Sequence, residues 1–300
     1  MAQHSSATDR SDSNHRIEEN QDTGEGSTLR AAINAISDVV QNRPLPLREF
    51  DQIYMKTADM AMMAVFVAER FADQHIAFIG DGDAIALSVM HLLEQKLVKA
   101  GPKSIVVLDF DERIVNSITR FADKYQLSDR ISAVLYNVYD PLPNQIVGSK
   151  DGFYTNPPWG QSNGGESVIA FMERGIEACV AGGHGAVVIA DDPNAEWTYD
   201  VLLAVQRAAV REGFIVKEMV PEWHFYHLDD APDLRSCAIV IKDVERKMRT
   251  SRGLTLARAK TFYGRESPLK FRYVRERETL NWGRASEETY ELVPLETENG

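Results

Sequence analysis

Three short polar runs have residue types that could do chemistry, and each directly follows an apolar run typical of a strand. The first is Gly80-Asp81-Gly82-Asp83. Glycines permit a tight turn and close approach of a ligand to the backbone. Two carboxylates disfavour a pyrophosphate, which prefers exposed amides at a helix N-terminus. We therefore expect this turn to bind a cationic nucleoside such as a sulfonium, the alternative being a solvated turn that caps the next helix.

The second run contains Asp109 and Asp111, 29 residues after Gly80. An acidic side chain at the end of a second strand accepts hydrogen bonds from both ribose hydroxyls of a nucleoside. The spacing exceeds the usual figure of about 20 residues, and one long helix accounts for the difference. We predict that Asp109 contacts the ribose. The alternative is that Asp111 and Glu112 only cap the following helix.

The third run is Asn156-Pro157-Pro158-Trp159, the most specific signal in the chain. Two prolines restrict the backbone, so that the Asn156 oxygen and a proline carbonyl can accept protons from one amino group. The Trp159 ring offers a flat wall or a cation–π face. This turn is typical of a site that holds an amine nitrogen with its lone pair facing an electrophile, and the alternative is a rigid turn without chemistry.

Alternating strands and helices must position these runs. The apolar pattern predicts strands at 75–79, 104–109, 131–136, 152–155, 185–190, 214–219 and 236–241, and helices near 84–100, 112–125, 166–179 and 197–212. This alternation indicates an α/β fold with a doubly wound parallel sheet, which binds ligands at the carboxyl ends of its strands. Asp191 and Asp192 follow the fifth strand and add carboxylates to the same rim, unless they are simply solvated loop.

The chain divides into four predicted parts. Residues 1–27 are polar and predict a disordered leader, 28–72 a helical lead-in, and 73–245 the catalytic domain. Residues 246–300 form a basic aromatic arm and an acidic tail. The arm holds 12 Lys or Arg against 3 Glu between 246 and 284, whereas residues 46–245 carry a formal charge of −13. An acidic body favours amine-like partners over polyanions.

Composition narrows the class of protein further. The two cysteines, Cys179 and Cys237, exclude a disulfide framework and a four-cysteine zinc site. His224 and His227 lack a third ligand at useful spacing, so we expect no metal. The apolar stretches are shorter than the roughly 18 to 20 residues of a membrane span, and the N-terminus has no signal-peptide pattern. We therefore expect a cytoplasmic protein without a membrane segment.

Together with Phe50-Asp51-Gln52 ahead of them, the three runs resemble those of the branched-chain polyamine synthases, over about residues 29–243. The resemblance implies a Rossmann-like fold of the class I S-adenosylmethionine-dependent transferases. It also implies decarboxylated S-adenosylmethionine as donor and a polyamine nitrogen, as in spermidine, as acceptor. The donor residues would be Gly80, Asp81, Gly82, Asp83, Asp109, Asp111 and Asn137. The acceptor residues would be Asp51, Gln52, Tyr54, Asp191 and Asp192, with Asn156 to Trp159 at the reacting nitrogen.

Three residues depart from this family pattern, because Gly82, Asn137 and Asn156 stand where the family has aspartate. An amide accepts a hydrogen bond but cannot take a proton. Asn-Pro-Pro-Trp also resembles the turn of amino-methyltransferases that act on adenine, cytosine or glutamine nitrogens. The sequence therefore leaves N-methyl transfer from S-adenosylmethionine itself as an alternative to aminopropyl transfer.

The arm leaves a further alternative open. Aromatic residues are interleaved with its basic residues, as in proteins that stack nucleic-acid bases; they are Phe262, Tyr263, Phe271, Tyr273 and Trp282. We favour the interpretation that the arm wraps a neighbouring subunit or its own acidic body, and therefore expect no nucleic-acid partner. The expected partners are a small-molecule amine or polyamine and a second copy of the chain in a homodimer.

Overall fold

The computed structural model describes residues 22–229, 231–262, 269–277 and 289–295. Most of the predicted disordered leader lies outside these residues. Residues 22–27, however, are the first turns of helix α1 (Asp22–Asn42), which begins before the predicted start of the helical lead-in at residue 28. A helix held by buried Ala32, Ile36 and Val39 can extend toward its N-terminus, because each added residue costs little once the helix is nucleated.

Within the described residues, the core is a seven-stranded sheet in the order β3-β2-β1-β4-β5-β7-β6. Its strands are β1 (His75–Ile79), β2 (Ser104–Asp109), β3 (Ile131–Leu135), β4 (Lys150–Thr155), β5 (Cys179–Ala190), β6 (Phe214–Phe225) and β7 (Arg235–Asp243). Strand β7 runs antiparallel to β5 and β6, and the other neighbours pair in parallel. The sheet confirms the predicted doubly wound α/β fold.

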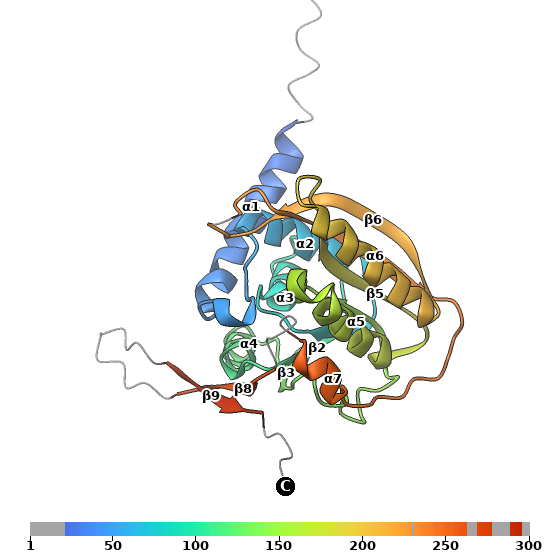
Figure 1. The fold of residues 1–300 in the computed structure, drawn as a ribbon. Helices are drawn as coiled ribbons and strands as arrows, with labels where there is room; N and C mark the ends of the chain where they lie inside the picture. The colour runs from blue at the N-terminus through green and yellow to red at the C-terminus, as the bar shows by residue number, and fades with distance from the viewer. Residues whose placement is uncertain (1–21, 230, 263–268, 278–288, 296–300) are drawn as a thin grey trace, which may run out of the picture.

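Helices cover both faces of this sheet (Figure 1). One face carries α2 (Thr57–Arg70), α3 (Ile85–Glu94) and α4 (Glu112–Lys124), and α1 packs on these helices. The other face carries α5 (Glu166–Ala178) and α6 (Glu196–Arg211). Each face has its own hydrophobic core, which is why β1 and β2 are apolar nearly throughout.

The largest differences in length from the prediction are in α3, β5 and β6. Helix α3 ends at Glu94 rather than near residue 100, and Lys96 just beyond it adopts a left-handed conformation that ends the helix. Strands β5 and β6 are longer than predicted, at 12 residues each. Their extra residues are rich in glycine or alternate in polarity, so the apolar runs alone did not reveal them.

The ring of Phe153 in β4 packs against two glycines, one in α5 and one in β5. A Cβ added at Gly175 of α5 or at Gly185 of β5 would lie 2.1 Å from a carbon of the Phe153 ring. The ring therefore fills a slot that only glycine leaves open. This packing sets the position of β4, whose end leads directly into Asn156.

The described part of the arm folds back onto the body. It contains α7 (Leu256–Lys260) and a hairpin of β8 (Phe271–Glu276) and β9 (Tyr290–Pro294), elements that the sequence did not reveal. Figure 1 shows this hairpin beside α4. The amide of Val274 donates to the carbonyl of Phe110 over 3.1 Å, which joins β8 to the loop after β2. No helix among the described residues is both long and apolar enough to cross a membrane.

Candidate active site

A cavity of about 690 Å³ lies at the carboxyl ends of β1, β2 and β4. Every residue predicted to contact the donor, the acceptor or the reacting nitrogen lines it except Asp111 and Asp191; those on its wall are Asp51, Gln52, Tyr54, Gly80, Asp81, Gly82, Asp83, Asp109, Asn137, Asn156, Pro157, Pro158, Trp159 and Asp192. The doubly wound topology brings them together, because parallel strands end at one edge of the sheet.

Asp81 serves the fold as well as the cavity. Its carboxylate accepts hydrogen bonds from the amides of Ile85, over 2.8 Å, and Ala86, over 3.0 Å, at the start of α3. Burial raises the pKa of this carboxyl well above its usual value, although the two amides lower it. The carboxylate thus caps α3, the role that the sequence left as the alternative, but it is buried rather than solvated.

The side chain of Asp109 connects the turn after β1 with the turn after β2. Its Oδ2 accepts from the amide of Asp81 and its Oδ1 from the amide of Asp111, each over 2.9 Å. The residue is buried, and burial together with the Asp111 charge raises the pKa of its carboxyl to about 7. Both oxygens keep a lone pair for a ligand, because each accepts one hydrogen bond from an amide.

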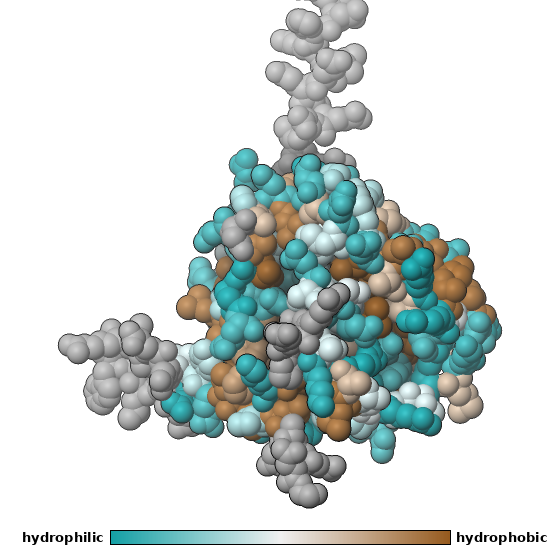
Figure 2. Space-filling model, in the orientation of Figure 1, coloured by the Kyte–Doolittle hydropathy of each residue, from teal (hydrophilic) through white to brown (hydrophobic). Residues whose placement is uncertain are grey.

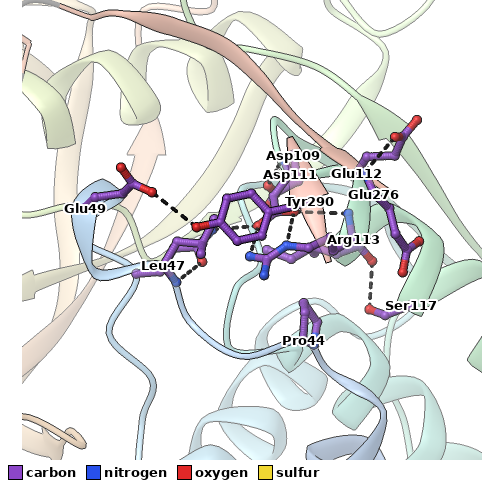
Figure 3. A network of polar contacts seen from close by, with 12 residues as sticks. Pro44, Leu47, Glu49, Asp109, Asp111, Glu112, Arg113, Ser117, Glu276 and Tyr290 are labelled. Carbon is purple, nitrogen blue, oxygen red and sulfur yellow. Dashed lines mark hydrogen bonds and ion pairs between the residues drawn. The ribbon is translucent and has the colours of Figure 1, made fainter. Parts of the chain in front are cut away.

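Asp111 was predicted as a donor-binding residue, but the structure places it off the cavity wall. Its side chain caps α4 by accepting from the Arg113 amide over 3.0 Å, and it forms a bidentate ion pair with the Arg113 guanidinium. Gln52 donates to the same carboxylate over 3.1 Å. Figure 3 shows Tyr290 of the hairpin across Arg113, 4.9 Å from ring centroid to guanidinium carbon. Asp111 therefore connects α4 with the lead-in and, through Arg113, with the arm. A capping side chain turns back toward the amides of its own helix, which is why Asp111 does not face the cavity.

Asn137 lines the cavity with its side chain already engaged by the backbone. Its Nδ2 donates to the carbonyl of Arg272 in the arm over 2.6 Å, and its Oδ1 accepts from the amide of Tyr139 over 2.9 Å. An aspartate here could not donate to the Arg272 carbonyl. The asparagine therefore suits the contact between the arm and the loop after β3.

The Asn-Pro-Pro-Trp turn follows β4. Asn156 donates from Nδ2 to Oδ2 of Asp83 over 2.6 Å. The carbonyl of Pro158 accepts from the Ser167 hydroxyl over 3.1 Å, so the carbonyl of Pro157 is the better candidate to face a ligand. Trp159 packs edge-on against Tyr226 with ring centroids 4.9 Å apart. The turn thus has a polar side at Asn156 and an aromatic side at Trp159.

The lead-in closes the cavity from the side of α2. Tyr54 donates its hydroxyl to the carbonyl of Pro44 over 3.1 Å, and the Arg43 guanidinium lies 4.3 Å from its ring centroid. The Met55 amide donates to Oδ1 of Asp83 over 2.7 Å. Asp51, with a left-handed backbone, also faces the cavity. These contacts tie the lead-in to the turn after β1.

The two acidic residues after β5 are separated by the structure. Asp192 lines the cavity, is buried, and accepts from the amide of Asn194 over 2.9 Å. Asp191 points away from the cavity, where its carboxylate accepts from the Glu222 amide over 3.0 Å. Adjacent residues leaving a strand point to opposite sides, so Asp191 is directed toward β6, which contains Glu222.

Several wall residues were not found from the sequence. They come from α5, α6, the loop before β7 and the arm: Phe171, Trp197, Tyr226, Leu228, Leu234, Phe262 and Leu269. Most are apolar or aromatic and occur inside ordinary amphipathic patterns, so no local signal separates them from core residues. Within the described ranges, no group of three His, Cys, Asp or Glu residues is arranged to hold a metal ion.

Comparison with known proteins gives the chain a set of relatives. The family described as the branched-chain polyamine synthase A C-terminal domain matches residues 31–279. An N(4)-bis(aminopropyl)spermidine synthase of Thermococcus kodakarensis is 24% identical over 65% of this chain and 52% of its own length. The chain spans about half the length of the curated relatives it matches.

Two solved structures share the fold. The branched-chain polyamine synthase of Thermus thermophilus, in complex with N4-aminopropylspermidine and 5′-methylthioadenosine, superposes with a TM-score of 0.61 and 20% identity over 75% of this chain and 67% of that one. A candidate RNA methyltransferase of Pyrococcus horikoshii gives a TM-score of 0.54 and 14% identity over 73% of this chain and 99% of that one. The fold is thus that of the class I S-adenosylmethionine-dependent transferases.

Proposed function

Because the chain belongs to the branched-chain polyamine synthase family, we propose that it transfers an aminopropyl group from decarboxylated S-adenosylmethionine to an amine nitrogen of a polyamine. One observation carries the proposal. The predicted ribose contact, Asp109, and the amine-binding turn at Asn156 line the same cavity, on either side of the turn Gly80 to Asp83. A donor and an acceptor bound there would meet beside the buried carboxylates Asp81 and Asp83.

The cavity supports this chemistry by position and charge. The amine nitrogen attacks the carbon bonded to the sulfonium sulfur, and the carbon–sulfur bond breaks with its electron pair going to sulfur. Such a displacement requires an in-line approach and a neutral amine. Asp109 would hold the ribose, the acidic turn would hold the cationic donor, and Asp192 and Asp51 would attract the distal ammonium groups of a polyamine.

A donor assay tests the proposal directly. Purified protein is incubated with spermidine and either decarboxylated S-adenosylmethionine or S-adenosylmethionine, and the product mass is measured. We expect a gain of one or more aminopropyl groups with the decarboxylated donor and no product with the intact donor. The Asp109→Ala variant serves as the inactive control. A gain of one methyl group with the intact donor would refute aminopropyl transfer.

N-methyl transfer stays the second candidate because of one residue. Asn156 offers an amide where an aspartate is expected, as in amino-methyltransferases, and its Nδ2 is held by Asp83. The buried carboxylates Asp81 and Asp83 weigh against it, since they would repel the carboxylate of intact S-adenosylmethionine.

Donor binding is expected to depend on pH through Asp109. The carboxylate form accepts hydrogen bonds from the ribose hydroxyls, and burial raises the pKa of this carboxyl to about 7. The ionised fraction therefore rises with pH, and binding of methylthioadenosine should strengthen by about tenfold between pH 6 and pH 8. Calorimetry across this range measures the change. The Asp109→Asn variant should lack the step, and an unchanged step in that variant would assign it to another group.

A substitution at Gly82 is expected to weaken binding of the acceptor amine by displacing Tyr54. A Cβ at Gly82 would lie 3.1 Å from Cε1 of the Tyr54 ring, so Gly82→Ala must displace a ring that Pro44 and Arg43 hold. We expect KM for spermidine to rise by about 2- to 10-fold, with KM for the donor changed less. Steady-state kinetics in both substrates measures this, and Tyr54→Phe, which keeps the ring, is the comparison. Equal KM values in Gly82→Ala and wild type would contradict the prediction.

The arm favours contact with its own body over nucleic acid. Its arginines form ion pairs with carboxylates elsewhere in the chain, at 2.6 to 2.8 Å: Arg249 with Asp243, Arg258 with Glu173, Arg272 with Asp140 and Arg275 with Glu112. Paired guanidiniums attract phosphates less than free ones. The arm also contributes Phe262 and Leu269 to the cavity wall, which supports a role in the site.

A homodimer and a cytoplasmic location stay predictions. Hydrophobic side chains are exposed on α6 and β6, and Figure 2 shows apolar surface on this side of the molecule. They are Leu203, Val210, Ile215, Val216 and Met219. Strand β6 is also an edge of the sheet, and an apolar edge is suited to an interface with a second copy.

A further inference from the structure

The carboxylate of Asp83 links two turns that are 73 residues apart. Its Oδ2 accepts from Nδ2 of Asn156 over 2.6 Å, and its Oδ1 accepts from the Met55 amide over 2.7 Å. The residue is 5% exposed. Both oxygens of Asp83 therefore act as hydrogen-bond acceptors, one toward the lead-in and one toward the Asn-Pro-Pro-Trp turn.

Arg43 supports this acceptor role. Its guanidinium donates to the main-chain carbonyl of Asp83 over 3.3 Å. Burial raises the pKa of the Asp83 carboxyl, while the Met55 amide, Arg43 and Asn156 act in the opposite direction. Oδ1 of Asp83 accepts from the Met55 amide and Oδ2 lies 2.6 Å from Nδ2 of Asn156, so in its carboxylate form Asp83 directs the NH2 group of Asn156 toward itself.

The orientation of Asn156 follows from the geometry of an amide. The NH2 group and the carbonyl oxygen are bonded to the same amide carbon and point in different directions. A hydrogen bond that fixes the NH2 group therefore also fixes the direction of the oxygen. Asn156 lines the cavity, and with Nδ2 held by Asp83 the oxygen Oδ1 is the acceptor left for a ligand. The neighbouring Tyr226 hydroxyl is engaged with the Ser236 hydroxyl over 2.9 Å, and a side-chain hydrogen bond with Asn156 lowers the pKa of this phenol, as expected when the NH2 group of Asn156 donates to it and leaves Oδ1 free.

We propose that Asp83 is a positioning residue that orients Asn156, so that the site selects a neutral primary or secondary amine; this rests on the proposed transfer to an amine nitrogen. The amine donates one N–H to Oδ1 of Asn156, which leaves its lone pair free. The lone pair forms the new carbon–nitrogen bond as the carbon–sulfur bond breaks, and the nitrogen becomes an ammonium. Any proton that made the free amine cationic passes to water before the transfer. Asn156 therefore never has to accept one, which accounts for an amide in the place of a carboxylate.

The inference is tested by exchanging the carboxylate at position 83 and the amide at position 156, first by Asp83→Asn alone and then in a double variant. In Asp83→Asn, the new amide must still accept from the Met55 amide and so turns its NH2 group toward Asn156. Asn156 then rotates, presents its own NH2 group to the cavity, and opposes the N–H of the amine. We expect kcat/KM for the amine to fall about 10- to 100-fold, the effect of losing one well-placed hydrogen bond and leaving a donor unpaired.

The double variant Asp83→Asn/Asn156→Asp restores the pairing with reversed polarity. The amide at position 83 donates to one oxygen of the carboxylate at position 156, and the other oxygen faces the amine. We expect kcat/KM to return to within about fivefold of wild type, a coupling that additive effects would not produce. A double variant no more active than Asp83→Asn would overturn the inference.

Controls separate orientation from folding. Asp59→Asn is the matched control, since Asp59 is a buried carboxyl that lies off the cavity wall, and it should keep kcat/KM within about twofold of wild type. Methylthioadenosine has neither the sulfonium charge nor the aminopropyl ammonium group that the acidic turn would attract, so its affinity should be equal in wild type and Asp83→Asn. A loss of this affinity in parallel with activity would mean that Asp83 acts through the donor side, and would also overturn the inference.

The kcat/KM values of the variants are compared with the donor that the wild type uses, whether it is decarboxylated S-adenosylmethionine or S-adenosylmethionine. Methyl transfer would therefore refute the proposed function, and the comparison of variants would still test the role of Asp83. If wild type turns over neither donor, spermidine binding in the presence of methylthioadenosine is measured instead by calorimetry. The same order is expected, with the double variant close to wild type and Asp83→Asn weaker. Equal affinities in all three proteins would overturn the inference.

Discussion

Replacing Asp109 with alanine is expected to weaken methylthioadenosine binding at least about 100-fold and to abolish turnover. The reason is that a carboxylate can accept hydrogen bonds from both ribose hydroxyls, and each hydrogen bond to a charged group contributes about 1.5 to 3 kcal/mol. The same carboxylate holds the amides of Asp81 and Asp111, so its loss also loosens the turns after β1 and β2. Calorimetry with the nucleoside measures the affinity.

Two comparisons isolate the ribose contact from this loosening. Asp109→Asn keeps the size of the side chain and one acceptor oxygen, so it should fall between wild type and Asp109→Ala. Asp129→Ala changes an exposed aspartate in the loop before β3 and should leave affinity unchanged. If Asp109→Ala bound methylthioadenosine within about threefold of wild type, the nucleoside would not depend on this carboxylate.

The second large effect is expected on stability, from Gly185→Ala. A Cβ at Gly185 would lie 2.1 Å from the Phe153 ring, and Gly175 leaves no room on the other side of that ring. Overpacking of this kind costs about 3 kcal/mol and should lower Tm by about 5 °C or more in a chain of this length. Thermal unfolding followed by circular dichroism measures the shift.

The same substitution should reduce activity, because β4 leads into the Asn-Pro-Pro-Trp turn. Thr155, at the end of β4, donates its hydroxyl to the carbonyl of Ile79 over 2.7 Å, so a displaced β4 also disturbs β1. The double variant Gly185→Ala/Phe153→Leu removes the clash and should regain part of the lost Tm. A Tm of Gly185→Ala equal to that of wild type would show that the sheet absorbs the added methyl group.

The fold class was predictable because its signal is local. Apolar runs of four to six residues between longer amphipathic segments predicted β1, β2, β3, β4 and the helices between them. The hairpin β8–β9 was not predicted, since Val274 is buried against the Phe110 loop rather than within a repeating pattern. Short strands stabilised by distant residues leave little trace in their own sequence.

The candidate site was predictable to the extent that topology positions it. Gly80 to Asp83, Asp109 and Asn156 lie at the ends of β1, β2 and β4, which are neighbours in the sheet. Parallel strands end at one edge, so their meeting in one cavity required no side-chain detail. The direction of each side chain did require it. Asp109 and Asp111 are two residues apart and equally acidic, yet one lines the cavity and the other caps α4.

The sequence by itself determined which chemical groups this protein brings to the edge of its sheet: carboxylates after two strands, an amide and an aromatic ring after a third, and no aspartate at position 156. Only the tertiary structure decided what those groups can do. It paired Asp111 with Arg113, and it turned the Asn156 amide by placing Asp83 within 2.6 Å of it. The physical reason is that residue type sets whether a group can donate or accept a proton, whereas the partners that fix its direction come from segments far apart in the chain.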